Sequence, residues 1–149
     1  RQNMWCWAAC VAMALRFQKL NVTQEDVVNK AFNRLINNPG NSMDMVKGAS
    51  GWQQDGKNIK AWAELSRKPK IIIDDLAYKY PLVIGLNNPG QSIGHAYLLT
   101  AIYFTGDINH NIYPTMVTLR DPWPGAQSRV QMSWKEFIDR VNTIVHITF

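Results

Sequence analysis

The chain has 149 residues, of which 46% are hydrophobic and 18% are charged, and its formal net charge is +5. This size and composition predict one domain over residues 1–149 with a single core, and no apolar run approaches the roughly 20 residues of a membrane span. Lysine and arginine are scattered along the sequence, which argues against nucleic acid as a partner. Because the first residue is Arg1 rather than Met, we expect a processed product or an excised domain.

The N-terminal part has the pattern of helices. Residues 5–19 are rich in alanine and contain few polar side chains, which predicts a helix buried on all sides. Thr23, followed three residues later by Asp26, is typical of an N-cap and predicts a second helix through about residue 37. Residues 41–57 are rich in Gly, Ser, Asn and Gln without periodicity, so we expect a long surface loop there.

The rest of the chain changes from helical to strand patterns. A short helix is expected over residues 58–66, and a helical turn from residue 74 or 75 to residue 80. Segments rich in β-branched and aromatic residues then predict strands at 82–86, 96–104, 115–119 and 143–149. Ser133 is typical of the cap of a late helix that runs to about residue 141. Helices followed by strands predict an α+β fold.

Cys6 and Cys10 lie four residues apart on the first predicted helix, where side chains share a face but are too far apart for a disulfide bond. Cys6 lies at the start of that helix, where the helix dipole and free N–H groups stabilise a thiolate and an oxyanion. This position favours a nucleophile, although a cysteine in an apolar segment is by residue type more often a small core residue. Cys10 is assigned to the core.

A cysteine nucleophile needs a base, and histidine has a suitable pKa of about 6.5. His110 lies in a polar segment that we expect to form a hairpin tip, where a histidine is usually solvated. His146 alternates with apolar residues in the last predicted strand, as a core or edge histidine would. His95 follows Gly94 at the start of a predicted strand, so a rigid element would present its ring beside a glycine that allows close approach. This context favours His95 as the base.

The second nitrogen of such an imidazole needs an acceptor that fixes its orientation. Asp121 ends an apolar strand and precedes Pro122, which ends strand pairing. Trp123 and Pro124 follow and supply apolar bulk that would keep water from the hydrogen bond. The alternative interpretation of Asp121 is an ordinary turn that begins with Asp-Pro.

Three stretches together carry a resemblance to a known family: QNMWCWAAC at residues 2–10, GHAY at 94–97 and LRDPWP at 119–124. In this order they resemble the papain-like cysteine peptidases. Within that family they are most similar to the compact bacterial branch related to double-glycine leader peptidases and to effector proteases of plant pathogens. The order of helices and strands matches the family along most of the chain.

The resemblance implies a papain-like fold, in which a helical lobe with a buried N-terminal catalytic helix packs on a lobe of antiparallel strands. It assigns Cys6, His95 and Asp121 to the nucleophile, the base and the residue that orients the base. The family also places a glutamine before the cysteine as a donor to the oxyanion. Gln2 is the only glutamine there, closer to Cys6 than papain-type spacing, so a donor upstream of Arg1 is the alternative.

We therefore expect a cysteine endopeptidase that hydrolyses peptide bonds through a thioester acyl-enzyme. The resemblance implies no metal or cofactor, a protein or peptide substrate, a monomer, and a protein that is secreted or delivered into another cell. A cell-wall amidase or endopeptidase with the same Cys–His pair is one alternative, and the basic composition would suit its anionic substrate. A binding module with a vestigial triad, in which the predicted loop at 41–57 makes the contacts, is another.

Overall fold

The computed structural model describes residues 5–35, 40–90, 94–122 and 128–148. Within these ranges it contains five helices and a six-stranded sheet in which all neighbouring strands are antiparallel. The strand order across this sheet is β3-β8-β4-β5-β6-β7. The predicted α+β class is therefore confirmed.

Helices dominate the first third of the described chain and strands dominate the remainder. The helices are α1 (Cys6–Phe17), α2 (Gln24–Phe32), α3 (Ser42–Ala49), α4 (Lys70–Ala77) and α5 (Trp134–Arg140). The strands are β1 (Gln53–Gln54), β2 (Lys57–Asn58), β3 (Lys60–Glu64), β4 (Leu82–Leu86), β5 (His95–Gly106), β6 (Ile112–Arg120), β7 (Arg129–Ser133) and β8 (Val141–Thr148). None of the described helices has the length and apolar character needed to cross a membrane.

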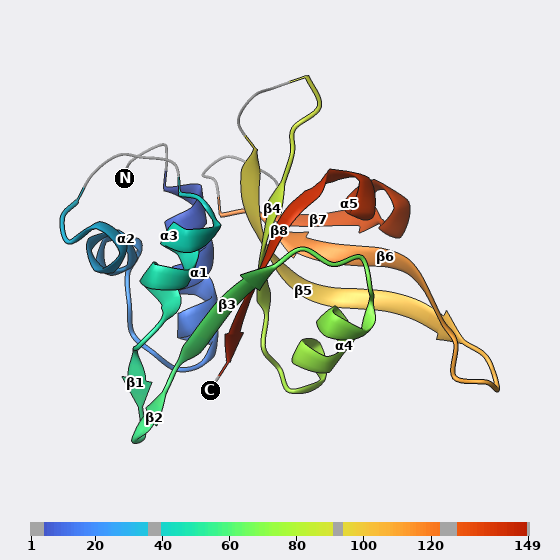
Figure 1. Ribbon diagram of the computed structural model, residues 1–149, viewed down its shortest axis with the longest axis horizontal. Coiled ribbons are helices and arrows are strands. Elements are labelled where there is room, and N and C mark those ends of the chain that lie inside the picture. Colours follow the sequence, from blue (N-terminus) through green and yellow to red (C-terminus); the bar gives the residue numbers. More distant parts are fainter. Residues whose placement is uncertain (1–4, 36–39, 91–93, 123–127, 149) are drawn as a thin grey trace.

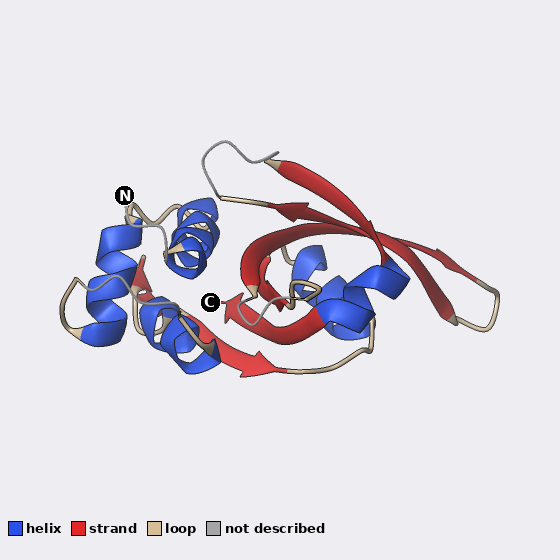
Figure 2. Ribbon diagram, turned by 90° about the horizontal axis from the view of Figure 1, so that it is seen from above, coloured by secondary structure: helices blue, strands red, loops and turns tan. Residues whose placement is uncertain are grey.

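Two hydrophobic cores lie on opposite faces of the sheet, in place of the single core that was expected. On one face α1 and α3 contact the strands and α2 packs against both helices, and Val83 of β4 points into this core (Figure 1). On the other face Ile72 of α4 and Phe137 of α5 pack with Ile84 of β4 (Figure 2). Strand β4 is buried along its whole length because its alternating side chains enter the two cores in turn. Strand β5 pairs with this doubly covered strand.

The first two helices agree with the sequence patterns. Helix α1 is buried along most of its length, as predicted. Helix α2 begins with a capping box, in which Thr23 Oγ1 accepts the Asp26 N–H at 3.1 Å and Asp26 Oδ2 accepts the Thr23 N–H at 2.9 Å. It ends at Phe32, earlier than expected, because Asn33 adopts the left-handed conformation with φ 59° and closes the helix.

Two predictions for the middle of the chain are wrong. Part of the expected loop at 41–57 forms helix α3, which begins with a second capping box between Asn41 and Asp44. The expected helix at 58–66 is replaced by strand β3, each residue of which pairs with β8. Alanine, lysine and glutamate favour helices, but pairing with a strand far away in sequence overrides that preference.

The later elements differ from the predictions mainly at their ends. All four predicted strands are present as β4, β5, β6 and β8, and β5 and β6 are longer than expected. Helix α4 begins at Lys70, earlier than the predicted turn, and the edge strand β7 was not predicted. The late helix α5 has the predicted cap, because Ser133 Oγ accepts the N–H of Glu136 at 3.1 Å.

The hairpin of β5 and β6 projects beyond the rest of the sheet (Figure 1). Its turn is held by Asp107, whose Oδ1 accepts the N–H groups of Asn109 at 2.9 Å and Asn111 at 3.0 Å. The outer part of the hairpin is exposed, including Ile108 at 93%. His110 lies in this exposed turn, as predicted.

His146 is the centre of a buried charged cluster on β8. Its Nδ1 lies 2.5 Å from Asp75 Oδ2 of α4, and its Nε2 lies 2.6 Å from Glu64 Oε2 of β3. The contact with Glu64, whose side chain is 37% exposed, is an ion pair. The ring of Trp62 stacks on the imidazole, with centroids 4.8 Å apart. His146 is only 2% exposed, so of the two predicted settings, core or edge, it occupies the core.

Candidate active site

The start of α1 and the start of β5 bring Cys6 and His95 together. Cys6 is the first residue of α1 and His95 is the first residue of β5, and the helix packs against this strand. The two side chains share a hydrogen bond. The N-cap residue Trp5 provides no side-chain cap for α1, and the backbone N–H of Trp7 in the first turn donates to the Cys6 sulfur instead.

Asp121 lies on the other side of the imidazole. It follows the last residue of β6, the strand next to β5, and its Oδ1 accepts a hydrogen bond from His95 Nε2 at 2.9 Å. Because Nε2 is engaged by the carboxylate, Nδ1 is the nitrogen that faces the thiol. The side chains of His95 and Asp121 are 19% and 12% exposed, so water has limited access to this bond. The three residues singled out by sequence thus form one chain of contacts.

The environment of Cys6 favours the thiolate. Burial raises the pKa of the thiol, but the hydrogen bond from His95 and the backbone N–H of Ala96 lower it. The positive charge of His95 and the N–H of Trp7 lower it further, and the net pKa lies below its ordinary value. A thiolate at a helix N-terminus beside an imidazolium is an arrangement that makes cysteine a good nucleophile.

The environment of His95 favours the imidazolium. The hydrogen bond to Cys6 raises the pKa of His95, burial lowers it, and the hydrogen bond to Asp121 raises it again. Attraction to both anions adds to this effect and brings the pKa to about 9. Both shifts favour the thiolate–imidazolium form of the pair, which can attack a carbonyl carbon and protonate a leaving group.

Comparison with known proteins identifies the family. Residues 1–146 match the Peptidase_C39 like family. The chain belongs to this family. No curated protein matches the chain. Membership in the Peptidase_C39 like family supports a cysteine peptidase, and so a hydrolase with protein substrates. It agrees with the resemblance to cysteine peptidases that the motifs indicated.

Gly94 allows β5 of this C39-like protein to begin close to β4. A Cβ atom at residue 94 would lie 2.5 Å from the carbonyl oxygen of Leu86, the residue of β4 that pairs with His95. No side chain fits at that distance from a backbone atom. The glycine therefore sets the position from which His95 enters the site.

We expect Gly94→Ala to displace the start of β5 and to lower kcat/KM by about 100-fold, because a misplacement of a reacting group by about 1 Å has effects of this size. Gly106→Ala is the matched control at the other end of the strand, where a Cβ would meet the Asn111 carbonyl oxygen at an ordinary 3.5 Å. Steady-state kinetics on both variants, with circular dichroism to verify folding, test this. Equal activity of the two variants would contradict it.

Tyr97 is a neighbour of the site that the sequence did not reveal. Its ring meets that of His95 edge to face, with centroids 4.7 Å apart and planes at 73°. Burial and the charge of Asp121 raise the pKa of Tyr97, whereas the charge of Arg140 and its hydrogen bond to the hydroxyl lower it, and the net pKa is raised. Residues two apart in a strand share a face, so Tyr97 lies on the same face of β5 as His95. This spacing is the feature of the sequence that could have predicted Tyr97 as a neighbour of the site.

Other residues predicted from the sequence fall outside the site as described. Gln2, the predicted oxyanion donor, and the apolar residues Trp123 and Pro124 lie outside the described residues. Cys10 is fully buried and Cys6 is half-buried, and no disulfide joins these two cysteines. Among the described residues no group of His, Cys, Asp and Glu side chains is arranged to hold a metal ion.

Proposed function

We propose that this protein is a papain-like cysteine endopeptidase in which Cys6 is the nucleophile, His95 the general acid and base, and Asp121 the residue that orients the imidazole. The observation that carries the proposal is the hydrogen bond between Cys6 at the N-terminus of α1 and His95, whose other nitrogen is bound by Asp121. Membership in a peptidase family supports the same reaction class.

In the proposed reaction the Cys6 thiolate attacks the carbonyl carbon of a peptide bond, and the carbonyl electrons move to oxygen. The backbone N–H groups at the start of α1 stabilise that oxyanion, and Gln2 remains the proposed side-chain donor. His95 then protonates the leaving nitrogen as the C–N bond breaks, which leaves a thioester on Cys6. His95 finally removes a proton from water, which attacks the thioester and releases the acid and the thiolate.

The substrate class is tested by offering the protein an unfolded protein and purified peptidoglycan in parallel. We expect cleavage of peptide bonds in the unfolded protein, detected by mass spectrometry, and no release of peptidoglycan fragments. The Cys6→Ala variant, run beside the wild type, identifies cleavage by contaminants. Release of peptidoglycan fragments alone would favour the cell-wall amidase, and cleavage of neither substrate together with an ordinary thiol pKa at Cys6 would favour the binding module.

The paired charges predict a bell-shaped dependence of kcat/KM on pH. The acidic limb reports protonation of the thiolate and lies below the ordinary thiol pKa, because the pKa of Cys6 is lowered. The alkaline limb reports loss of the His95 proton and lies near pH 9. Asp121→Asn should move the alkaline limb to lower pH, because it removes a negative charge that holds this proton. An activity that only begins to rise at alkaline pH, as an unperturbed thiol ionises, would contradict the prediction.

A further inference from the structure

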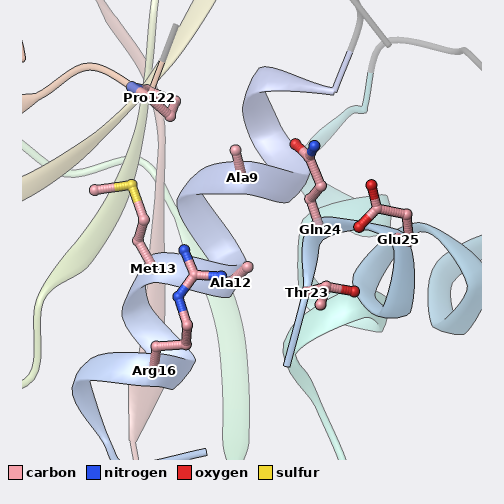
Figure 3. Close-up of a pocket in the computed structure, with 8 residues that line it drawn as sticks. All are labelled: Ala9, Ala12, Met13, Arg16, Thr23, Gln24, Glu25 and Pro122. Carbon is pink, nitrogen blue, oxygen red and sulfur yellow. The ribbon is translucent and has the colours of Figure 1, made fainter. Parts of the chain in front are cut away.

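A cleft of about 330 Å³ lies along α1 (Figure 3). Ala9, Met13 and Arg16 line it from α1, and they follow Cys6 at helical spacing on one face of the helix. Pro122, the residue after Asp121, lines the cleft from the opposite element. The cleft therefore has one lining residue a helical turn after Cys6 and another directly after Asp121 in the sequence, which places it next to the proposed active site.

The lining of the cleft is apolar along one part and polar at the end formed by α2. Ala9 is buried and Met13 is half-buried, and both present apolar atoms. Arg16 and Glu25 line it with opposite charges, and they come from different helices (Figure 3). The guanidinium of Arg16 is held in place because its Nη1 donates to the Val22 carbonyl at 3.1 Å. The two charges balance, so the cleft attracts neither a cation nor an anion strongly.

Gln24 adds a hydrogen-bond acceptor that has no partner. Its Oε1 is buried, and no hydrogen bond to it exists within the described part of the chain. A buried acceptor without a partner is unfavourable, and each such group in a native protein needs an explanation. The terminal amide torsion of glutamine is broad, so a small rotation turns this oxygen toward a donor in the cleft.

We propose that this cleft is a substrate subsite that holds the side chain of a glutamine residue near the scissile bond. The inference rests on the proposed endopeptidase function. A primary carboxamide carries both a donor and an acceptor without net charge: its NH2 group donates to Gln24 Oε1 and the Glu25 carboxylate, and its carbonyl accepts from Arg16. The two methylenes of the side chain lie on Ala9 and Met13. The volume is at the lower end for ligand sites and is large enough to admit a side chain.

The test uses peptides that differ only in carrying Gln, Glu, Lys or Met at one position, scanned across the residues that flank the scissile bond. At one position we expect kcat/KM for Gln to exceed that for the other three by about tenfold or more, because the analogues leave polar groups of the cleft unpaired. Arg16→Met should shift the preference at that position toward Lys, and Glu25→Gln should shift it toward Glu. Arg34→Met, at an exposed arginine beyond the end of α2, is the matched control and should leave the preference unchanged.

Gln24→Met separates a role in substrate binding from a role in folding. Because Oε1 has no partner within the described residues, this isosteric change should not lower the unfolding temperature, yet it should remove most of the preference for Gln. Cleavage with no preference at any position, or a preference that Arg16→Met and Glu25→Gln both leave intact, overturns the subsite while the endopeptidase stands.

A binding experiment covers the case in which the wild type cleaves none of the peptides. Fluorescence anisotropy with the Cys6→Ala protein measures the affinity of the same labelled peptides without turnover. Tighter binding of the Gln peptides that is lost in the Cys6→Ala, Gln24→Met double variant supports the cleft even though the proposed reaction fails. Equal affinity for all four peptides overturns the inference.

Discussion

Cys6→Ala is expected to lower kcat/KM by on the order of 10⁴-fold or more, because removal of a nucleophile removes the covalent route altogether. The same variant should lose labelling by iodoacetamide at neutral pH. The hydrogen bond and charge of His95, together with backbone N–H groups, lower the pKa of Cys6, and Cys6 lies at the N-terminus of α1. The expected loss is therefore specific to the first of the two cysteines in α1.

Cys10→Ala is the matched control, since it makes the same substitution one turn further along α1. Cys10 is fully buried among apolar residues, so its replacement should change activity by only a few-fold and affect mainly stability. Peptide mapping by mass spectrometry after alkylation assigns the labelled cysteine in each variant. Labelling that persists on Cys10 in the Cys6→Ala protein would contradict the assignment of the nucleophile.

His146→Leu is expected to have the largest effect on stability, a loss of about 3–5 kcal/mol in the free energy of unfolding. The substitution removes the cation from between Asp75 and Glu64 and leaves the carboxylate of Asp75, which is 15% exposed, without its partner. Urea denaturation at about pH 6 measures the loss. His110→Asn in the exposed hairpin turn is the control and should have little effect, because asparagine tolerates the left-handed conformation with φ 65° found there.

Neutralising the carboxylates tests the physical cause of that loss. If unpaired negative charge is responsible, Asp75→Asn with Glu64→Gln should restore part of the stability of His146→Leu, and the non-additivity measures the coupling. A loss that is the same with and without the carboxylates would instead assign the effect to packing against Trp62.

The contribution of His146 should depend on pH in a defined direction. Burial lowers the pKa of His146, but the hydrogen bond to Asp75 and the charges of Asp75 and Glu64 raise it, and the net pKa is raised. A histidine whose pKa is higher in the folded protein stabilises it fully below the unfolded value of about 6.5 and loses this effect as the pH rises through the folded pKa. The difference in unfolding free energy between wild type and His146→Leu should therefore shrink as the pH rises above about 6.5, and a difference that grows would contradict this.

The sequence predicted the elements whose signals are local. The apolar helix after Cys6, the Thr23 cap and the β-branched runs of β4 and β8 each carry their pattern within a few residues. The proposed site residues were found for a related reason, because each lies at an end of an element, where a strand or helix pattern stops and a polar residue begins.

The missed features depend on contacts between distant segments. Strand β3 has the composition of a helix and becomes a strand because β8 pairs with it. The cap of α3 was present as Asn41 and Asp44, but the surrounding Gly, Ser and Asn residues suggested a loop. The cleft beside the site requires α1, the start of α2 and Pro122 to meet, and no pattern within any one segment encodes that meeting.

The twelve residues of strand β5 differ in how many neighbouring strands they pair with. Residues 95–99 pair with β4, and Leu98 and Leu99 pair with β6 as well, whereas the last residues of β5 reach into the exposed hairpin and pair with β6 alone. The backbone amides of Leu98 and Leu99 should therefore exchange with deuterium far more slowly than those near Gly106, since they open only with the core. Fraying at the outer turn need not reach the reacting groups, which makes the segment around Ile108 a suitable place to insert an epitope or a fluorophore without disturbing catalysis.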